Sequence, residues 1–205
     1  MFTEAFHSIV AAALPMLIIF IVVIASVRLS YLKSNGKKLV IHEEIFNLLF
    51  IIYVLLLFEL LTGTENSLGS GINYIPFKEI MRYKFMSKMF IYNVLGNVLI
   101  FVPFGYFISR YINPKKITPI AIDAIITSVT VETVQLKIGR SFDIDDVILN
   151  LVGAIVGYFV YVAIEAIIRH LPKFLQKDFI YDIISIIILI IFILYAANIL
   201  DLGWL

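Results

Sequence analysis

Carboxylates, amides and one arginine gather in a short stretch of an otherwise apolar chain. They are Glu132, Gln135, Arg140, Asp143, Asp145, Asp146 and Asn150. Side chains of these types support general acid–base catalysis, ligation of a hard cation, or hydrogen bonding to a polar ligand. Because apolar runs flank the polar gap on both sides, the stretch predicts a helix, a loop and a second helix.

Glu132 and Gln135 are three residues apart, so on a helix they share one face and point into the same space. Arg140 is placed to pair with Glu132 or with the aspartates that follow it. A paired carboxylate stays ionised, whereas a desolvated and unpaired one can act as a general acid. The simpler interpretation is an ion pair that tethers the loop, and catalysis stays open beside it.

The aspartates Asp143, Asp145 and Asp146 are candidate ligands for a cation such as Ca²⁺, but the spacing lacks the glycine of an EF-hand loop. Acids at this place more often cap a helix, and Asp145 or Asp146 suits the N-terminus of the following helix. We therefore expect no metal site. The chain carries no cofactor motif, and its three scattered histidines form no serine-hydrolase pattern.

The composition predicts an integral membrane protein. The 205 residues are 61% hydrophobic and 15% charged, with a mean hydropathy of +1.01, against about 25% charged residues in soluble domains. A net charge of +1 argues against a nucleic-acid partner. The absence of cysteine excludes disulfides and thiolate metal sites.

The fold class expected is an all-α, polytopic helical bundle with about six transmembrane helices. The expected spans are 5–27, 41–61, 89–109, 117–136, 147–164 and 183–200. Most of the 16 Lys and Arg residues lie in the links after the first, third and fifth spans. By the positive-inside rule, both termini are then extracytoplasmic, and the Glu132 to Asp146 region lies on the same side.

The only long connection, 62–88, separates the second and third spans and is long enough to have a function of its own. Phe77, Met81, Phe85 and Met89 recur in it at steps of four among basic residues. Two interpretations stay open: an amphipathic helix in the headgroup region, and a basic solvated loop.

Polar residues of other spans fall at a similar depth, among them Glu59, Asn93 and Asn97. Charged groups inside a membrane are costly and usually face a bundle interior or a wet cavity. We therefore expect a polar pocket open to the outer surface. The alternative is that the amides only cross-link helices. Asn150, Gly153 and Gly157 share one helix face, which predicts close helix packing.

Three blocks of this sequence resemble the VanZ-like membrane proteins, a family named for a teicoplanin resistance determinant. In chain order they are INYIPFKEI, NVLGNVLIFVPFGYFISR and VETVQLKIGRSFDIDDVILNLVGAIVGY. The resemblance adds Asn73 to the candidate binding residues. It divides the chain into an N-terminal pair of helices (1–72), a VanZ-like core (73–165) and a C-terminal helix with a tail (166–205).

The resemblance implies a role in resistance to teicoplanin or other lipoglycopeptides, in the cytoplasmic membrane of a Gram-positive cell. The expected partner is a membrane lipid, a cell-wall precursor or a lipid-bearing glycopeptide, bound at the outer-leaflet pocket. The alternative is an intramembrane enzyme that modifies a lipid-linked precursor of the cell envelope. The sequence leaves the ligand and the oligomeric state open.

Overall fold

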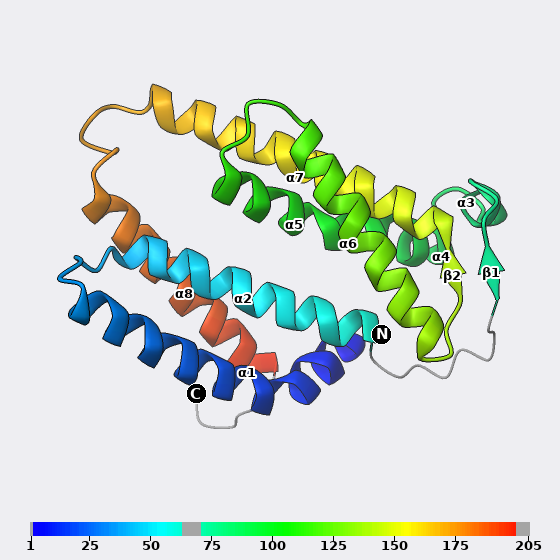
Figure 1. The fold of residues 1–205 in the computed structure, drawn as a ribbon, viewed down its shortest axis with the longest axis horizontal. Helices are drawn as coiled ribbons and strands as arrows, with labels where there is room; N and C mark the ends of the chain where they lie inside the picture. The colour runs from blue at the N-terminus through cyan, green and yellow to red at the C-terminus, as the bar shows by residue number, and fades with distance from the viewer. Residues whose placement is uncertain (1, 63–70, 200–205) are drawn as a thin grey trace. The chain divides into compact units, whose positions relative to one another are not determined.

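The computed structural model describes the backbone of residues 2–62 and 71–199, and the side chains of residues 16–60 and 71–191. The described chain is mostly helical and divides into two compact units (Figure 1). Unit 1 comprises Met1–Gly63 and Leu171–Leu205, and unit 2 comprises Thr64–His170.

Unit 1 is built from three helices, α1 (Phe2–Ser34), α2 (Ile41–Thr62) and α8 (Asp178–Ile199). A turn at Gly36, whose φ is 61°, reverses the chain so that α1 and α2 lie side by side (Figure 1). Glycine suits this left-handed conformation because it has no Cβ.

Polar side chains link the helices of unit 1 in separate pairs. Arg28 of α1 forms an ion pair with Glu44 of α2, with 2.9 Å between Nε and Oε2. The backbone nitrogen of His42 and its ring Nδ1 each lie 2.8 Å from Oδ1 of Asp182 on α8. These contacts tie the start of α2 to both of its neighbours.

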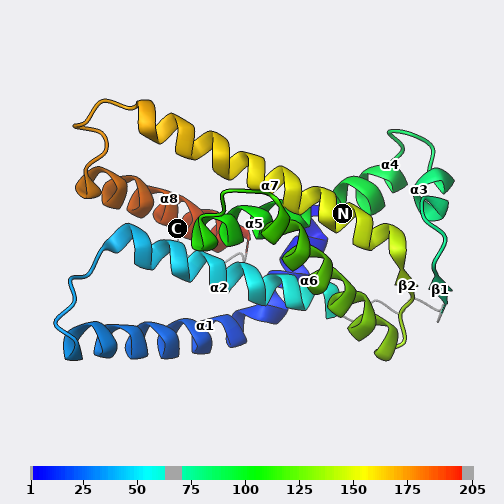
Figure 2. The same ribbon diagram turned by 45° about the horizontal axis from the view of Figure 1, so that its top comes forward.

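Unit 2 contains the residues of the polar stretch. Its elements in chain order are β1 (Ile72–Asn73), α3 (Lys78–Arg82), α4 (Lys88–Phe90), the π-helical turn η1 (Ile91–Leu95), α5 (Gly96–Ile112), α6 (Thr118–Lys137), β2 (Phe142–Asp143) and α7 (Ile144–His170). Helix α7 packs extensively against α5 and also against α6 (Figure 2).

Glycines allow α5 and α7 to approach until their backbones touch. A Cβ on Gly153 would collide with the carbonyl oxygen of Val98, and a Cβ on Gly157 with that of Val102. Gly105 of α5 meets the backbone of α7 in the same way. The close packing predicted for Gly153 and Gly157 is therefore confirmed. Asn150 faces α6 instead, where its amide donates to Ser128.

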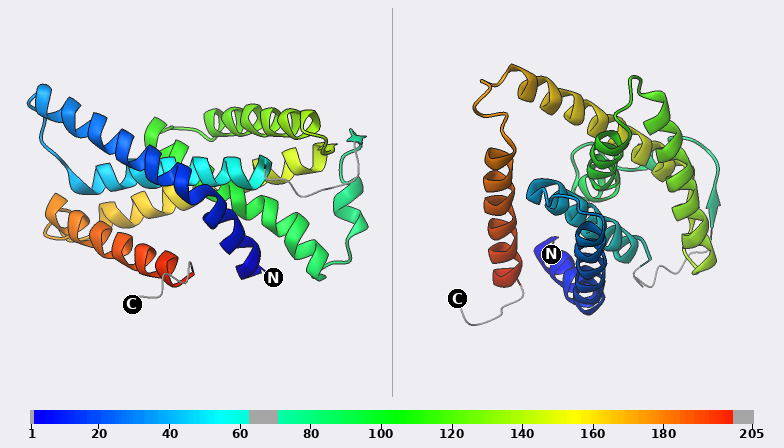
Figure 3. Two further views of the ribbon diagram at one scale, coloured as in Figure 1. Left: turned by 90° about the horizontal axis from the view of Figure 1, so that it is seen from below. Right: turned by 60° about the vertical axis from the view of Figure 1, so that its left-hand side comes forward.

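Two short strands join the long connection to the polar stretch. They pair in parallel, with Ile72 opposite Phe142 and Asn73 opposite Asp143. The strands and α3 lie at the same end of unit 2 as the start of α7 (Figures 2 and 3). The pairing brings the residues of β1 next to the α6–α7 connection, about 70 residues away in the sequence.

Five stretches of the described residues are long and apolar enough to cross a membrane. They are Met16–Ser34, Ile41–Leu60, Lys88–Ile112, Thr118–Lys137 and Ile144–His170. The last four of these stretches match the second to fifth expected spans, whereas Met16–Ser34 overlaps only the second half of the span expected at 5–27; together they support an all-α membrane protein. The expected sixth span falls on α8, which is not among these stretches of the described chain.

Of the two interpretations left open for the segment from Phe77 to Met89, a single amphipathic helix is not what the described backbone forms. The described backbone forms α3 and α4 only, and an irregular stretch between them contains Met86 with φ of 58°. Phe77 is also left-handed, with φ of 66°. A left-handed residue breaks the run of helical dihedrals, so the step-of-four pattern cannot form one continuous face.

Candidate functional site: an acidic cluster at one end of unit 2

Four carboxylates meet where α6 ends and α7 begins, and we call them the acidic cluster. They are Glu132, Asp143, Asp145 and Asp146. Each negative charge needs a partner when it is withdrawn from water, so the hydrogen bonds around the cluster decide what it can do.

Glu132 is held inside unit 2, with 2% of its surface exposed. It lies on the buried face of α6, together with Ser128 and Gln135. Its Oε2 accepts a hydrogen bond from the backbone N–H of Asp143, at 2.9 Å. The carboxylate therefore fixes β2 to the last turns of α6.

Asp143 connects three segments through one oxygen. Its Oδ1 accepts from the side-chain amide of Asn73 and from the backbone N–H of Asp145, both at 2.9 Å. Burial raises the pKa of the Asp143 carboxyl above its ordinary value, while these two hydrogen bonds act in the opposite direction. The bond to Asp145 is the N-terminal cap of α7, so Asp143 has the role expected of Asp145 or Asp146.

Asp145 instead caps a different helix. Its Oδ1 accepts from the backbone N–H of Phe77, and its Oδ2 accepts from those of Glu79 and Ile80, at 2.8 and 3.1 Å. Only 1% of Asp145 is exposed. The expectation that it caps the helix in which it lies is wrong, because the β1–β2 pairing places the start of α3 directly against its carboxylate.

Asp146 lies between Asn97 and the other acids. The Asn97 amide donates to Oδ1 of Asp146 and also to the backbone oxygen of Asn93. Glu132, Asp143 and Asp145 repel its charge, and Arg140 attracts it. Arg140 also attracts Glu132, so it partly balances the charge of both of these acids.

The remaining predicted site residues lie around the cluster at different depths. Asn150 and Ser128 form a buried hydrogen bond of 2.8 Å between α7 and α6. Gln135 is buried on α6. Asn93 is exposed, and its amide donates to the carbonyl oxygen of Met89 in its own helix. Hydrogen bonds thus connect Asn73, Glu132, Asp143 and Asp145 with one another, and further bonds join Asn97 to Asp146 and Asn150 to Ser128. Glu59 belongs to α2, in unit 1.

Every carboxylate of the acidic cluster accepts at least one of these hydrogen bonds. Glu132 uses Oε2 and Asp146 uses Oδ1, whereas Asp145 uses both of its oxygens. Glu132 and Asp146 are close enough to act on each other electrostatically. Because an ionised carboxylate only accepts hydrogen bonds, a ligand for this pair would have to bring N–H or O–H donors.

Some participants were not predicted from the sequence. Ser128 was missed, although it lies four residues before Glu132 and therefore on the same face of α6. The backbone N–H groups of Phe77, Glu79 and Ile80 were also missed. No pattern in the sequence could have found them, since each depends on the fold of the loop.

No group of three or more His, Cys, Asp or Glu side chains in the described residues is arranged to hold a metal ion. The acids of the cluster accept hydrogen bonds from side-chain amides and backbone N–H groups, and their oxygens do not converge on one position.

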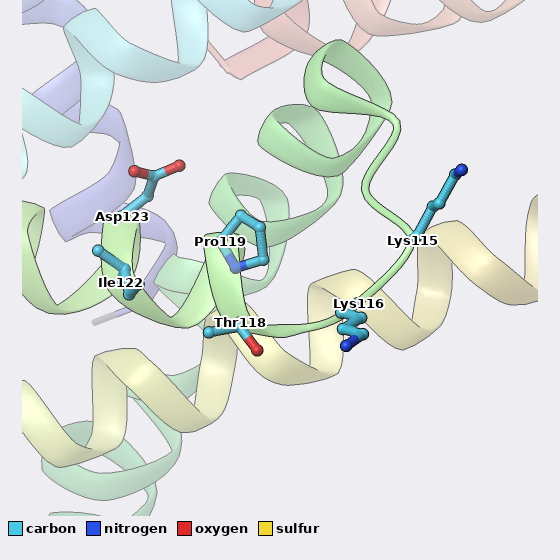
Figure 4. Close-up of a pocket in the computed structure, with 6 residues that line it drawn as sticks. All are labelled: Lys115, Lys116, Thr118, Pro119, Ile122 and Asp123. Atoms are coloured by element: carbon cyan, nitrogen blue, oxygen red, sulfur yellow. The ribbon is translucent and has the colours of Figure 1, made fainter.

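An open depression of about 730 Å³ lies at the other end of α6. Lys115, Lys116, Thr118 and Asp123 are among its lining residues. The two amino groups and the Asp123 carboxylate point in different directions (Figure 4). They do not converge on one position that a ligand would occupy.

The fold and the cluster define a helical membrane protein with four acids gathered at one end of unit 2. A family model described as VanZ/LLP1 matches residues 44–168, which is more than half of the chain. The chain belongs to this family. No curated protein and no solved structure matches it.

Proposed function

We propose that this protein is a multi-pass protein of the cytoplasmic membrane of a Gram-positive cell that binds the polar part of a membrane-embedded ligand at its acidic cluster. The ligand is a lipid headgroup, a lipid-linked cell-wall precursor or a lipid-bearing glycopeptide such as teicoplanin. Resistance to such a drug follows if binding keeps it from concentrating at the membrane.

The observation that carries the proposal is the neighbouring pair of carboxylates Glu132 and Asp146, which interact electrostatically and lie in stretches long and apolar enough to cross a membrane. An acid within a membrane span is costly and is usually functional. The other acids have structural roles, since Asp143 and Asp145 cap helices. Glu132 and Asp146 are therefore the residues proposed to contact the ligand, with Arg140 balancing their charge.

The proposed orientation places the cluster at the outer surface. Lys115 and Lys116 lie in the α5–α6 turn, and Arg169 lies at the last turn of α7. Both places are at the end of unit 2 opposite the cluster, since α5 and α7 run away from it and α6 returns. Basic residues mark the cytoplasmic side by the positive-inside rule. In intact cells, a membrane-impermeant label should react with Ser141→Cys, at an exposed position of the α6–α7 connection, and not with Lys115→Cys.

The binding proposal is tested with variants that keep side-chain size and remove charge. Glu132→Gln and Asp146→Asn should abolish the protection of a sensitive host against teicoplanin while the protein is still made. Asp123→Asn is the matched control, because it removes a carboxylate of α6 far from the cluster. Unchanged drug susceptibility in both cluster variants would rule out the proposed site.

The second candidate function is an intramembrane enzyme that modifies a lipid-linked precursor. It is favoured by the same neighbouring pair, since two carboxyl groups that interact with each other can divide the roles of general acid and general base. Mass spectrometry of precursor and lipid pools, with and without the protein, separates the two functions. A new covalent species that disappears in Glu132→Gln supports the enzyme, and unchanged pools support binding.

A further inference from the structure

The segment between β1 and η1, Tyr74–Phe90, exposes large apolar side chains, and we call it the strap. Met81 is 80% exposed and Phe85 is 76% exposed. Met86 and Met89 are exposed as well. Neighbouring apolar side chains that are left uncovered by their own chain mark an interaction surface.

The strap is held in this arrangement and is not a loose loop. Asp145 accepts hydrogen bonds from three of its backbone N–H groups, and Asn73 accepts one from Ile75. Ser87 caps α4 through a hydrogen bond from the backbone N–H of Phe90. The apolar side chains are therefore presented outward by a fixed backbone.

Two residues of the strap adopt a conformation that is unfavourable for their type. Phe77 and Met86 have φ of 66° and 58°, in the left-handed region that bulky side chains rarely enter. Both side chains are exposed. Contacts within the described chain do not bury them, so burial against something outside the chain is the natural compensation for the strain.

Charge identifies the kind of partner. The strap carries four basic side chains, Lys78, Arg82, Lys84 and Lys88, and all of them are exposed. Its only acid is Glu79, which pairs with Arg82 at 3.1 Å. A surface that combines exposed Met and Phe with an excess of Lys is typical of contact with an anionic membrane surface.

Position supports the same partner. The helical stretch Lys88–Ile112, long enough to cross a membrane, begins inside the strap. Backbone hydrogen bonds also hold the strap to Asp145, at the first turn of the stretch Ile144–His170. It therefore lies level with the ends of two candidate spans, where a bilayer has its headgroups.

We infer that the strap is a membrane-surface anchor: its apolar side chains insert at the boundary of the acyl chains, and its basic side chains contact anionic headgroups. The inference is independent of the ligand proposed for the acidic cluster. The hydrogen bonds to Asp145 link this anchor to the acidic cluster. Contact with lipid therefore also fixes the position of the cluster at the membrane surface.

The chain contains no cysteine, so a single introduced cysteine can carry a polarity-sensitive fluorophore. The full-length variants Met81→Cys and Phe85→Cys are reconstituted in vesicles of phosphatidylcholine, with and without phosphatidylglycerol. Lys38→Cys, an exposed position in the α1–α2 turn, is the control. With iodide on both sides of the vesicle membrane, we expect blue-shifted emission and several-fold weaker quenching by iodide at both strap positions than at Lys38→Cys, together with quenching by lipids spin-labelled near the headgroup.

The charge component is tested by Lys84→Gln combined with Lys88→Gln, and its matched control is Lys115→Gln combined with Lys116→Gln at the other end of unit 2. Only the strap pair should lose the additional blue shift that phosphatidylglycerol produces. Iodide quenching at Met81→Cys equal to that at Lys38→Cys in both kinds of vesicle would overturn the inference. Disulfide formation between Met81→Cys of two copies, without quenching by spin-labelled lipid, would replace it with an interface between copies of the chain.

Discussion

The two units use polar residues in opposite ways. In unit 1 the ion pair Arg28–Glu44 and the contact His42–Asp182 are separate and partly exposed. In unit 2 the acids are more deeply buried and share partners: Asp143 bonds both Asn73 and the α7 backbone, and Asp145 receives three N–H groups. Exposed pairs contribute little to stability, whereas removal of a buried acceptor leaves its donors unsatisfied. We therefore expect unit 2 to be far more sensitive to substitution.

The largest effect is expected where the helices of unit 2 touch. Gly153→Val should lower the free energy of unfolding by about 3 kcal/mol, because the new side chain meets the backbone oxygen of Val98. Thermal unfolding of the purified protein in detergent measures this loss of stability. Gly96→Ala is the control, since its Cβ would have an ordinary contact of 3.8 Å. Equal stability of the two variants would contradict the close packing of α5 and α7.

Removal of the Asp145 carboxylate, which holds the strap, should have the next largest effect. Asp145→Ala leaves the N–H groups of Phe77, Glu79 and Ile80 without their acceptor, at a cost of about 2 kcal/mol. Hydrogen exchange should become faster at these three amides. Glu79→Gln removes a charge of the strap but keeps its hydrogen bonds to Asp145, so the three amides should still exchange slowly. Slow exchange in Asp145→Ala would show that the strap is held by other contacts.

A smaller effect is expected for the buried amide between α6 and α7. The hydrogen bond of Asn150 with Ser128 should have a coupling energy of about 0.6 kcal/mol, as is usual between membrane helices. The measurement is a double-mutant cycle with Asn150→Ala and Ser128→Ala. Strict additivity of the two substitutions would mean that the bond contributes nothing.

The smallest effect belongs to unit 1. Hydrogen bonds from the backbone N–H and the ring of His42 lower the pKa of the Asp182 carboxyl below its ordinary value. An acid with a lowered folded pKa stabilises the protein above the unfolded pKa, which is about 3.9, and this contribution is lost as the pH falls through the folded value. Asp182→Asn should therefore remove a small acid-dependent loss of stability in a thermal-unfolding series from pH 6 to pH 3. If stability depends on pH in the same way in Asp182→Asn and in the wild type, the hydrogen bonds of His42 do not stabilise the ionised Asp182 carboxylate.

Residue types and spacing predicted much of unit 2 before its structure was known. Apolar runs located the long helices, because a membrane span must satisfy its backbone internally. The polar gap from Arg140 to Asp146 marked the site, and the four-residue step from Gly153 to Gly157 marked the helix contact. These features depend on neighbours within one helix or one short loop, so local pattern suffices to find them.

The roles of individual acids were decided only by the tertiary structure. Asp143 and Asp145 are two residues apart and chemically identical, yet one caps α7 and the other holds α3. The sequence alone determined that this is a helical membrane protein with acids concentrated at one place. Which acid meets which donor depends on the pairing of β1 with β2, across about 70 residues of chain. A hydrogen bond selects its partner by distance and direction, and only the folded chain sets these.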